Sequence, residues 1–250
     1  MSNQTILITG ASGGIGSALA RVHARPGVTL LLWGRDAARL EETAAACRAR
    51  GADCHVESFD LRDVGALVVR LAAADAATPI DLAIFNAGLG GTAPDGAPAE
   101  TPEAARAVAE VNFVAPVTGA NAMAAAMAAR GHGQIVLIGS IAESFPLPMA
   151  PTYAATKAGL RMFAEALGIR LAKHGVTVTL VSPGFIDTAM SRQVTEPKPF
   201  LISADKAAAI IARGIARNAR TIVLPWQFAV IRALTSLLPR ALLRRVLSRA

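Results

Sequence analysis

Tyr153 and Lys157 are the residues of this chain whose types and spacing point most directly to acid–base chemistry. Tyr153 is the only tyrosine, and Lys157 follows four residues later in a predicted helix. Positions i and i+4 share one helix face, so the ammonium can lie beside the phenol and lower its pKa toward neutrality. A phenol tuned in this way can give a proton to an alkoxide or remove one from an alcohol. A Tyr-x-x-x-Lys pair alone is common, however, and is most often a surface pair.

A glycine-rich segment near the N-terminus has the residues needed to bind a phosphate. The first predicted strand ends in Thr9-Gly10-Ala11-Ser12-Gly13-Gly14-Ile15-Gly16, and a predicted helix follows at once. Glycines let backbone amides approach a pyrophosphate, and the helix N-terminus adds free N–H groups and its dipole. The spacing differs from G-x-G-x-x-G, and a glycine cluster can also be only a tight turn. Its place between strand and helix favours a dinucleotide site, with candidate contacts at Gly10, Ser12, Gly13, Gly14, Ile15 and Gly16.

The end of the second predicted strand bears on which dinucleotide would bind. NAD enzymes normally place an acid about 20 residues after the glycines, where it binds the ribose 2′-hydroxyl. Here the strand ends in Trp33-Gly34-Arg35-Asp36. Arg35 can pair with a 2′-phosphate, which favours NADP(H) over NAD(H). The alternative is a solvated Arg35 with Asp36 as a helix N-cap, and Asp60 is either an adenine contact or the cap of a helix beginning near Arg62.

Read together in chain order, these motifs resemble the short-chain dehydrogenases/reductases over about residues 4 to 224. The matching pieces are Thr9-Gly-x-x-x-Gly-x-Gly16, Asn86-Ala87-Gly88, Asn112, Ser140, Tyr153-Ala-Ala-Thr-Lys157 and Pro183-Gly184-Phe-Ile-Asp-Thr188. Any one piece is weak evidence. The full ordered set, with Ser140 thirteen residues before Tyr153, is highly specific.

The resemblance implies a role for each matching residue. Tyr153 would be the general acid/base, and Lys157 would also bind the nicotinamide ribose. Ser140 would hold the substrate carbonyl oxygen, while Asn112 would bend its helix and hold a water that connects Lys157 to solvent. The further cofactor contacts that the resemblance implies are Leu61, Asn86, Ala87, Gly88, Pro183, Gly184, Ile186 and Thr188.

Three features depart from the family pattern. Gly13 replaces a basic residue that often joins Arg35 around a 2′-phosphate. Glu143 stands where a glycine is usual, so a carboxylate lies near the substrate mouth, either as a polar contact or as a rim residue in water. The chain also continues from Pro225 to Ala250, where many tetrameric members end soon after the last strand. This extension argues against the usual tetramer, and we expect a homo-oligomer, with a dimer favoured.

Short β-rich runs alternate with longer helical patterns along almost the whole chain. The predicted strands are Thr5–Thr9, Val28–Trp33, Asp53–Ser58, Leu82–Phe85, Gln134–Gly139, Val176–Val181 and Thr221–Leu224. The predicted helices include Gly14–Ala24, Ala37–Arg50, Thr101–Ala129, Thr152–His174 and Ala204–Arg217. Most of the strands are continuously apolar, as in a parallel sheet covered by helices on both faces. We therefore predict a Rossmann-like, doubly wound α/β fold with seven parallel strands over residues 1–225, and 226–250 as a helical extension of that domain.

Composition and charge argue against several other classes of protein. Hydrophobic residues make up 53% of the chain and charged residues 17%, which is not the composition of a disordered chain. The net charge of +7 is a C-terminal property, because nine Lys/Arg and no Asp/Glu occur from Lys206 onward, while the preceding residues hold 16 basic and 18 acidic side chains. A nucleic-acid partner is therefore not expected, since phosphate binding needs a basic surface on the part that binds.

The cysteines and histidines predict neither a metal site nor a redox site. Cys47 and Cys54 form no C-x-x-C pair, and the four histidines are scattered without metal-ligand spacing. We interpret both cysteines as packing residues in a reducing compartment. No secretion signal precedes Ile6, and no run of about 18 uncharged apolar residues occurs. A membrane-spanning helix is not expected, and a cytoplasmic location is.

The C-terminal 25 residues carry much of the positive charge. Two helices are predicted, 226–238 and 240–249, separated by Pro239, and the second opposes four apolar residues to four arginines. Such a segment can pack over the substrate cleft or on a partner subunit, or it can lie on an anionic membrane surface.

The main hypothesis is an NADP(H)-dependent oxidoreductase that interconverts a small-molecule carbonyl and its alcohol. Two rivals remain: a non-catalytic NADP(H)-binding regulatory or scaffold protein, and a membrane-recruited reductase of lipid-like substrates. The substrate itself would be selected by loops near 90–98, 142–151 and 190–201.

Overall fold

The computed structural model describes residues 4–91, 97–193 and 197–237, and its core is one sheet of seven parallel strands. The strands are β1 (Gln4–Thr9), β2 (Val28–Gly34), β3 (Asp53–Ser58), β4 (Leu82–Phe85), β5 (Gly133–Ile138), β6 (Val176–Pro183) and β9 (Thr221–Leu224). Their order across the sheet is β3-β2-β1-β4-β5-β6-β9. The predicted doubly wound sheet is confirmed, and each predicted strand lies within two residues of the observed one.

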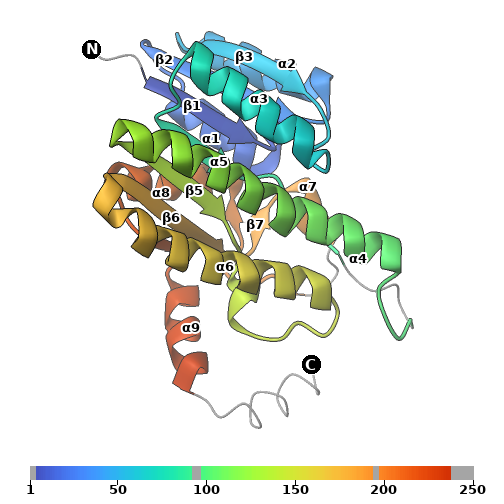
Figure 1. The fold of residues 1–250 in the computed structure, drawn as a ribbon. Coiled ribbons are helices and arrows are strands. Elements are labelled where there is room, and N and C mark those ends of the chain that lie inside the picture. The colour runs from blue at the N-terminus through green and yellow to red at the C-terminus, as the bar shows by residue number, and fades with distance from the viewer. Residues whose placement is uncertain (1–3, 92–96, 194–196, 238–250) are drawn as a thin grey trace.

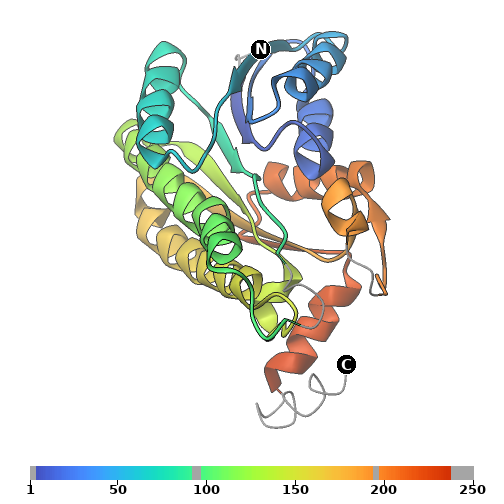
Figure 2. The same ribbon diagram turned by 90° about the vertical axis from the view of Figure 1, so that its right-hand side faces the viewer.

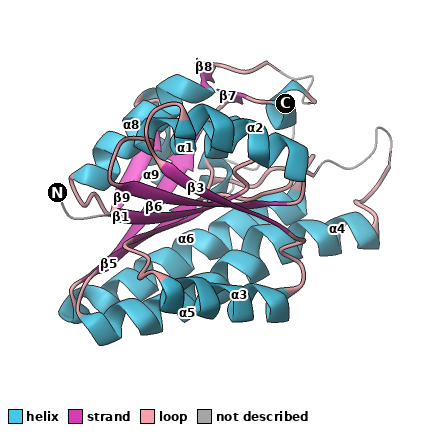
Figure 3. Ribbon diagram, turned by 90° about the horizontal axis from the view of Figure 1, so that it is seen from above, coloured by secondary structure: helices cyan, strands magenta, loops and turns pink. Residues whose placement is uncertain are grey.

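Helices cover both faces of this sheet, as Figure 3 shows. On one face lie α1 (Gly14–His23), α2 (Ala37–Arg48) and α8 (Ala204–Ala216), and on the other lie α3 (Val64–Ala77), α5 (Ala115–Arg130) and α6 (Pro151–Leu171). Successive side chains of a strand point to opposite faces. Ile6 and Ile8 accordingly enter the core beneath α1 and α8, whereas Leu7 enters the core beneath α3 and α5. This double burial is the reason that the strands have no polar alternation.

The order of the strands reverses between β1 and β4. β1 pairs with β2 on one side and with β4 on the other, so later strands are added outward in opposite directions from this pair. In open α/β sheets the ligand crevice lies outside the carboxyl ends of the strands at such a point. The glycine-rich segment after β1 and Asn86 after β4 both lie at this place.

The predicted helix 101–129 has the expected extent but is not uniform. It comprises α4 (Pro102–Ala109), a π-helical turn (Glu110–Val114) that contains Asn112, and α5. Figure 1 shows the three as one long diagonal rod. By length and composition this run could cross a membrane, but 50% of its most apolar window is buried inside the protein, as in the core helix of a globular domain.

Several short elements were not anticipated from the sequence. After β6 the chain forms a small second sheet, β7 (Ile186–Asp187) with β8 (Ile202–Ser203), and between them the short helix α7 (Ala189–Arg192). A 3-10 turn, η2 (Ile141–Ser144), follows β5, and another, η3 (Ala172–His174), ends α6.

The chain leaves the sheet through α9 (Gln227–Leu237), which lies outside the two helical layers in Figures 1 and 2. This helix corresponds to the predicted helix 226–238. Its Phe228 is buried and packs edge-on against Phe200, with ring centroids 5.8 Å apart. The second predicted helix, 240–249, lies outside the described residues, so the proposed extension 226–250 stays a prediction.

Candidate active site

The structure brings Ser140, Tyr153 and Lys157 together at the carboxyl end of β5. Ser140 lies two residues after this strand, and the other two residues lie in the first turns of α6. The Lys157 ammonium is 5.7 Å from the centroid of the Tyr153 ring and donates a hydrogen bond to the Ile138 carbonyl, 2.9 Å away. The Ser140 side chain lies close enough to the phenol of Tyr153 to lower its pKa. The i, i+4 spacing therefore places both functional groups on the helix face that covers the strand end.

Burial governs the protonation of this pair. It lowers the pKa of Lys157 to about 8, against an opposing effect of the nearby Glu143. It also raises the pKa of Tyr153, which the Ser140 side chain lowers and Glu143 raises further. The expected lowering of the Tyr153 pKa toward neutrality by Lys157 is therefore wrong for this structure, because desolvation disfavours the phenolate more than its neighbours stabilise it.

The Ser140 hydroxyl is oriented to donate its proton. Its Oγ accepts a hydrogen bond from the Ala142 main-chain N–H, 3.2 Å away, as the N-cap of η2. A hydroxyl has one proton and two acceptor lone pairs. Ser140 therefore keeps an O–H that can point at the phenol or at a substrate oxygen beside it.

Asn112 is fully buried in the π-helical turn and is held on both sides by Leu89. Its Oδ1 accepts from the Leu89 N–H at 2.7 Å, and its Nδ2 donates to the Leu89 carbonyl at 2.8 Å. A Cβ at Gly88 would lie 3.3 Å from Asn112 Oδ1 and 3.8 Å from Lys157 Nζ, so Gly88 adjoins both residues. Each amide group keeps one further hydrogen-bonding position, so the expected water that connects Lys157 to solvent stays a prediction.

The glycine-rich segment is closed against the end of β4. A Cβ on Gly16 would lie 2.2 Å from the Gly10 carbonyl oxygen and 2.5 Å from Asn86 Nδ2, and one on Gly10 would lie 2.8 Å from Ala87 Cα. Asn86 Nδ2 donates to the main-chain carbonyls of Thr9 and Gly10. Only glycine fits this tight turn, which leaves the N-terminus of α1 open to a phosphate.

Gly14 of the glycine-rich segment adjoins a side chain from a later element. Gly14 has a positive φ of 56°, and a Cβ there would lie 3.2 Å from Thr188 Cγ2. Thr188 caps α7 through a capping box with Ser191. The predicted contacts from opposite ends of the chain, Gly14 and Thr188, are therefore neighbours.

Arg39 is a functional candidate that sequence reasoning missed. A Cβ on Gly13 would lie 2.6 Å from Arg39 Nη2, so the guanidinium occupies the space that a side chain at position 13 would fill. Arg39 lies in the first turn of α2, whose start brings it back toward the segment after β1. The signal in the sequence was its position one turn after Arg35, on the helix that follows β2.

The structure assigns the two acidic residues near this edge to local roles. Asp36 caps α2 by accepting from the Arg39 N–H at 3.1 Å, which is the capping alternative expected for it. Asp60 does not cap a helix; Asp63 is the N-cap of α3. Asp60 instead pairs with Arg62 at 2.6 Å, a contact that lowers the pKa of its carboxyl. Arg35 is exposed on the surface at the end of β2.

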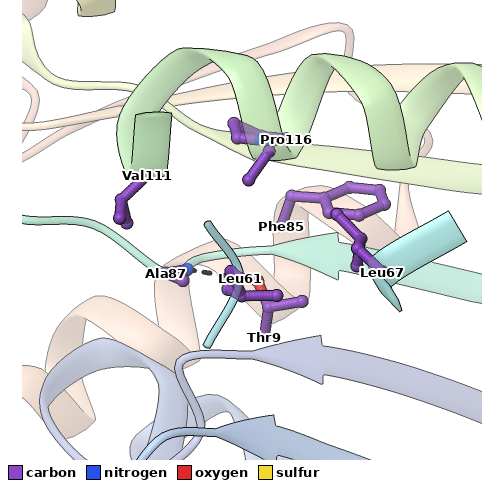
Figure 4. Close-up of a pocket in the computed structure, with 8 residues that line it drawn as sticks. Thr9, Leu61, Leu67, Phe85, Ala87, Val111 and Pro116 are labelled. Carbon is purple, nitrogen blue, oxygen red and sulfur yellow. Dashed lines mark hydrogen bonds between the residues drawn. The ribbon is translucent and has the colours of Figure 1, made fainter. Parts of the chain in front are cut away.

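Leu61 and Ala87 line a small cavity at the carboxyl ends of β1 and β4, shown in Figure 4. Thr9 also lines this cavity. Its hydroxyl accepts hydrogen bonds from the main-chain N–H groups of Asn86 at 3.0 Å and Ala87 at 3.2 Å. The cavity holds about 10 Å³, the space of a single water. It is a packing void between the strand ends and the helices that cover them, and it is too small for a dinucleotide.

The remaining predicted contacts are distributed around the same edge. Pro183 ends β6, Ile186 is buried in the core beneath α1, and Ile15 packs against that core. Ser12 Oγ is 3.5 Å from the position of a Cβ on Gly34. A Cβ on Gly184 would lie 2.1 Å from the Phe228 ring, so this glycine receives α9. No group of three potential metal ligands occurs among the residues that the structure describes.

Comparison with known proteins identifies what this arrangement belongs to. The family model for short chain dehydrogenases matches residues 4–199. The chain belongs to the short-chain dehydrogenase family. An uncharacterised oxidoreductase of Myxococcus xanthus (strain DK1622) is 33% identical over 97% of this chain and 95% of its own length.

Two further similarities bear on the chemistry of the family. A ketoacyl reductase of Nostoc sp. is 31% identical over 95% of this chain and 84% of its own length. A short-chain dehydrogenase from Sphingobium yanoikuyae, solved in complex with NADPH, is 28% identical over 95% of this chain and 97% of that one, with a TM-score of 0.82. The present chain is therefore an oxidoreductase with a nucleotide-binding Rossmann-like fold, of a family that acts on small molecules with alcohol or carbonyl groups.

Proposed function

We propose that this short-chain dehydrogenase is an NADP(H)-dependent enzyme that interconverts a carbonyl and an alcohol, with Tyr153 as the general acid and base. The observation that carries the proposal is the convergence of Ser140, Tyr153 and Lys157 at the end of β5. The glycine-rich segment supports a dinucleotide site beside them. Its backbone turns so tightly that a Cβ at Gly16 would lie 2.2 Å from the Gly10 carbonyl oxygen.

The residues divide the work of the reaction. The dinucleotide, when bound, supplies or accepts the hydride. The Ser140 hydroxyl donates a hydrogen bond to the substrate oxygen and stabilises the negative charge that develops there in reduction. Tyr153 gives its proton to that oxygen, and the Lys157 ammonium stabilises the phenolate that remains. In oxidation the same groups act in reverse, with the phenolate removing the alcohol proton.

The proposal is tested by following NADPH oxidation with a panel of ketones and aldehydes. Tyr153→Phe keeps the ring and removes the proton, so we expect a loss of at least about 100-fold in kcat, with NADPH still bound. Trp226→Leu, at a position that is 70% exposed just before α9, is the control for a changed aromatic residue. Binding of NADPH without any turnover by the unaltered protein would favour the non-catalytic regulatory or scaffold alternative.

Arg35 and Arg39 support the choice of NADP(H). Arg35 follows β2 at the place of the ribose-binding acid, and the Arg39 guanidinium fills the space beside Gly13. Two cations from different turns can hold a 2′-phosphate, and each charge-assisted hydrogen bond contributes about 1.5–3 kcal/mol. The basic residue missing at position 13 is, in this proposal, replaced by Arg39.

Affinity measurements with both dinucleotides test this choice. We expect Arg35→Ala and Arg39→Ala each to weaken NADPH binding by about 10- to 100-fold while NADH binding stays nearly constant. Arg48→Ala at the far end of α2, where the arginine pairs with Glu41, is the control. Equal losses for NADPH and NADH would contradict a contact with the 2′-phosphate.

Three further properties complete the proposal. We propose a homodimer, supported by the outward face of α6, where Met162 is 60% and Ile169 is 76% exposed. We propose that the enzyme acts in the cytoplasm, supported by the free, buried thiols of Cys47 and Cys54. We also propose that the arginines after position 238 make a peripheral contact with an anionic membrane surface.

A further inference from the structure

The carboxylate of Glu143 lies buried directly behind the candidate catalytic residues. Its side chain is 0% exposed, and its Oε1 accepts a hydrogen bond from Ser182 Oγ at 2.8 Å. Its main-chain N–H donates to the Ser140 carbonyl at 3.0 Å. The expectation that Glu143 is a rim residue in water is therefore wrong, because η2 turns this side chain inward beneath the end of β5.

The partner of this carboxylate comes from the far end of the chain. Arg232 of α9 places its Nη1 3.1 Å from Glu143 Oε1, across 89 residues of sequence. The second oxygen, Oε2, has no hydrogen-bond partner among the described residues and lies against Gly139, where a Cβ would be 2.8 Å away. A buried carboxylate is costly unless it is paired. Glu143, Arg232 and Gly139 thus form one arrangement.

Other charged and polar groups face Glu143 from the elements that pack against η2. From α6 these are Tyr153, Lys157 and Arg161, from α9 Arg232, and from β6 Ser182. Burial raises the pKa of Glu143, while the Ser182 hydrogen bond and the charges of Arg232 and Arg161 lower it. The ionised carboxylate in turn raises the pKa values of Lys157 and Tyr153.

We propose that Glu143 is a positioning residue for Ser140, Tyr153 and Lys157, and that its ion pair with Arg232 makes α9 a structural part of the active site. This inference rests on the proposed function of the three residues. Through its main chain Glu143 holds the carbonyl of Ser140, and through its charge it favours the protonated forms of Lys157 and Tyr153. Arg232 keeps the carboxylate ionised and fixes α9 over η2.

Glu143→Gln tests the electrostatic part of the proposal. The amide keeps the shape and the Ser182 contact but removes the charge, so we expect the pH profile of kcat/KM to move to lower pH by about one unit. A merely structural role would lower the rate without moving the profile. Glu41→Gln removes a carboxylate from the exposed pair with Arg48 and is expected to leave the profile in place. A Glu143→Gln profile that superimposes on that of the unaltered enzyme overturns the proposal.

Arg232 variants test the same pair without relying on turnover. Hydrogen exchange of the amides of α9 is expected to accelerate at least about 10-fold in Arg232→Met and to be largely restored in Arg232→Lys, which keeps the charge. Should Glu143→Gln fail to fold, these variants still decide the question, and unchanged exchange in Arg232→Met overturns the docking. If the unaltered protein reduces no carbonyl, the proposed function fails, whereas the exchange measurement still reports whether the pair holds α9.

Discussion

Lys157 is buried, and Tyr153 beside it is partly buried. Desolvation acts on opposite forms in the two residues: it raises the pKa of Tyr153 and lowers that of Lys157 to about 8. Near neutral pH the phenol thus holds its proton and the amine is mostly charged. This is the state required at the start of a carbonyl reduction, in which the phenol gives up its proton beside a cation.

The pH dependence of reduction should therefore follow Lys157. As the pH rises through about 8 the amine loses the charge that stabilises the phenolate, so we expect kcat/KM for NADPH-dependent reduction to fall there. Lys157→Met should abolish this limb together with most of the activity. Rates measured from about pH 6 to about pH 10 check the expectation, and a flat profile in the unaltered enzyme contradicts it.

The same lysine should cost the protein stability. Its pKa of about 8 in the folded state lies below the ordinary value of 10.5, so between these values the unfolded chain binds more protons and stability rises with pH. Below pH 8 the full cost, about 3 kcal/mol, is present, and the lost hydrogen bond to Ile138 in Lys157→Met offsets part of what its removal returns. We expect the Tm of Lys157→Met at neutral pH to be unchanged or raised, and a fall of about 5 °C or more would contradict this.

Among single residues, those whose contacts depend on local spacing could be identified from the sequence. Tyr153 and Lys157 share a helix face, and Ser140 follows a strand, so their types and order sufficed. Arg39 and the environment of Glu143 could not be read in this way. The contact of Arg39 with Gly13 depends on how α2 returns to the glycine turn, and the Glu143 partner lies 89 residues away.

The turn between β1 and α1 is the element on which the cofactor site depends most. Gly16 lies in the first turn of α1, and a Cβ there would lie closer to the Gly10 carbonyl than real contacts permit. The backbone of the turn would have to open, which would also disturb the Asn86 bonds that tie β4 to β1. The geometry of this single turn therefore links the contact between β4 and β1 to dinucleotide binding.

Gly16→Ala should consequently weaken NADPH binding by at least about 10-fold and lower the Tm, because the added methyl forces the turn apart. Gly65→Ala in α3 is the matched control, since its Cβ would meet Asp63 Oδ1 at an ordinary 3.6 Å. That change should stabilise the helix by up to about 1 kcal/mol. Fluorescence titration and thermal melts check both, and a Gly16→Ala protein that binds NADPH as the unaltered one does contradicts the role of the turn.

Among the strands and helices, uninterrupted apolar runs were the informative signal. They predicted all seven strands of the main sheet, because strands covered on both faces have no polar side. The π-helical turn at 110–114 was hidden within a continuous helical pattern, and the bond from the Leu89 N–H to Asn112 that accompanies it joins residues 23 positions apart. The small sheet of β7 and β8 was missed because two-residue strands have no period to detect.

On the scale of the whole molecule, α9 links the sheet edge to the active site. Phe228 packs against Gly184 after β6, and Arg232 reaches Glu143 after β5, so the helix touches the ends of two strands that bear predicted site residues. The opposite side of α9 is exposed, with Val230 47% and Leu234 60% accessible. One side of this helix therefore serves the site, and the other is available to a surface.

Two truncations separate these uses of the C-terminal segment. Ending the chain after Leu237 keeps Phe228 and Arg232 but removes four arginines, so we expect unchanged NADPH oxidation and loss of flotation with anionic vesicles. Ending it after Pro225 also removes both contacts of α9, and the carboxylate of Glu143 loses its cation; we expect reduction to fail or the KM to rise steeply. Vesicles of zwitterionic lipid and high salt serve as controls, because attraction to arginines is screened. If the full chain does not float with anionic vesicles, the proposed membrane contact is contradicted. If the protein that ends after Pro225 keeps full activity, α9 has no part in the active site.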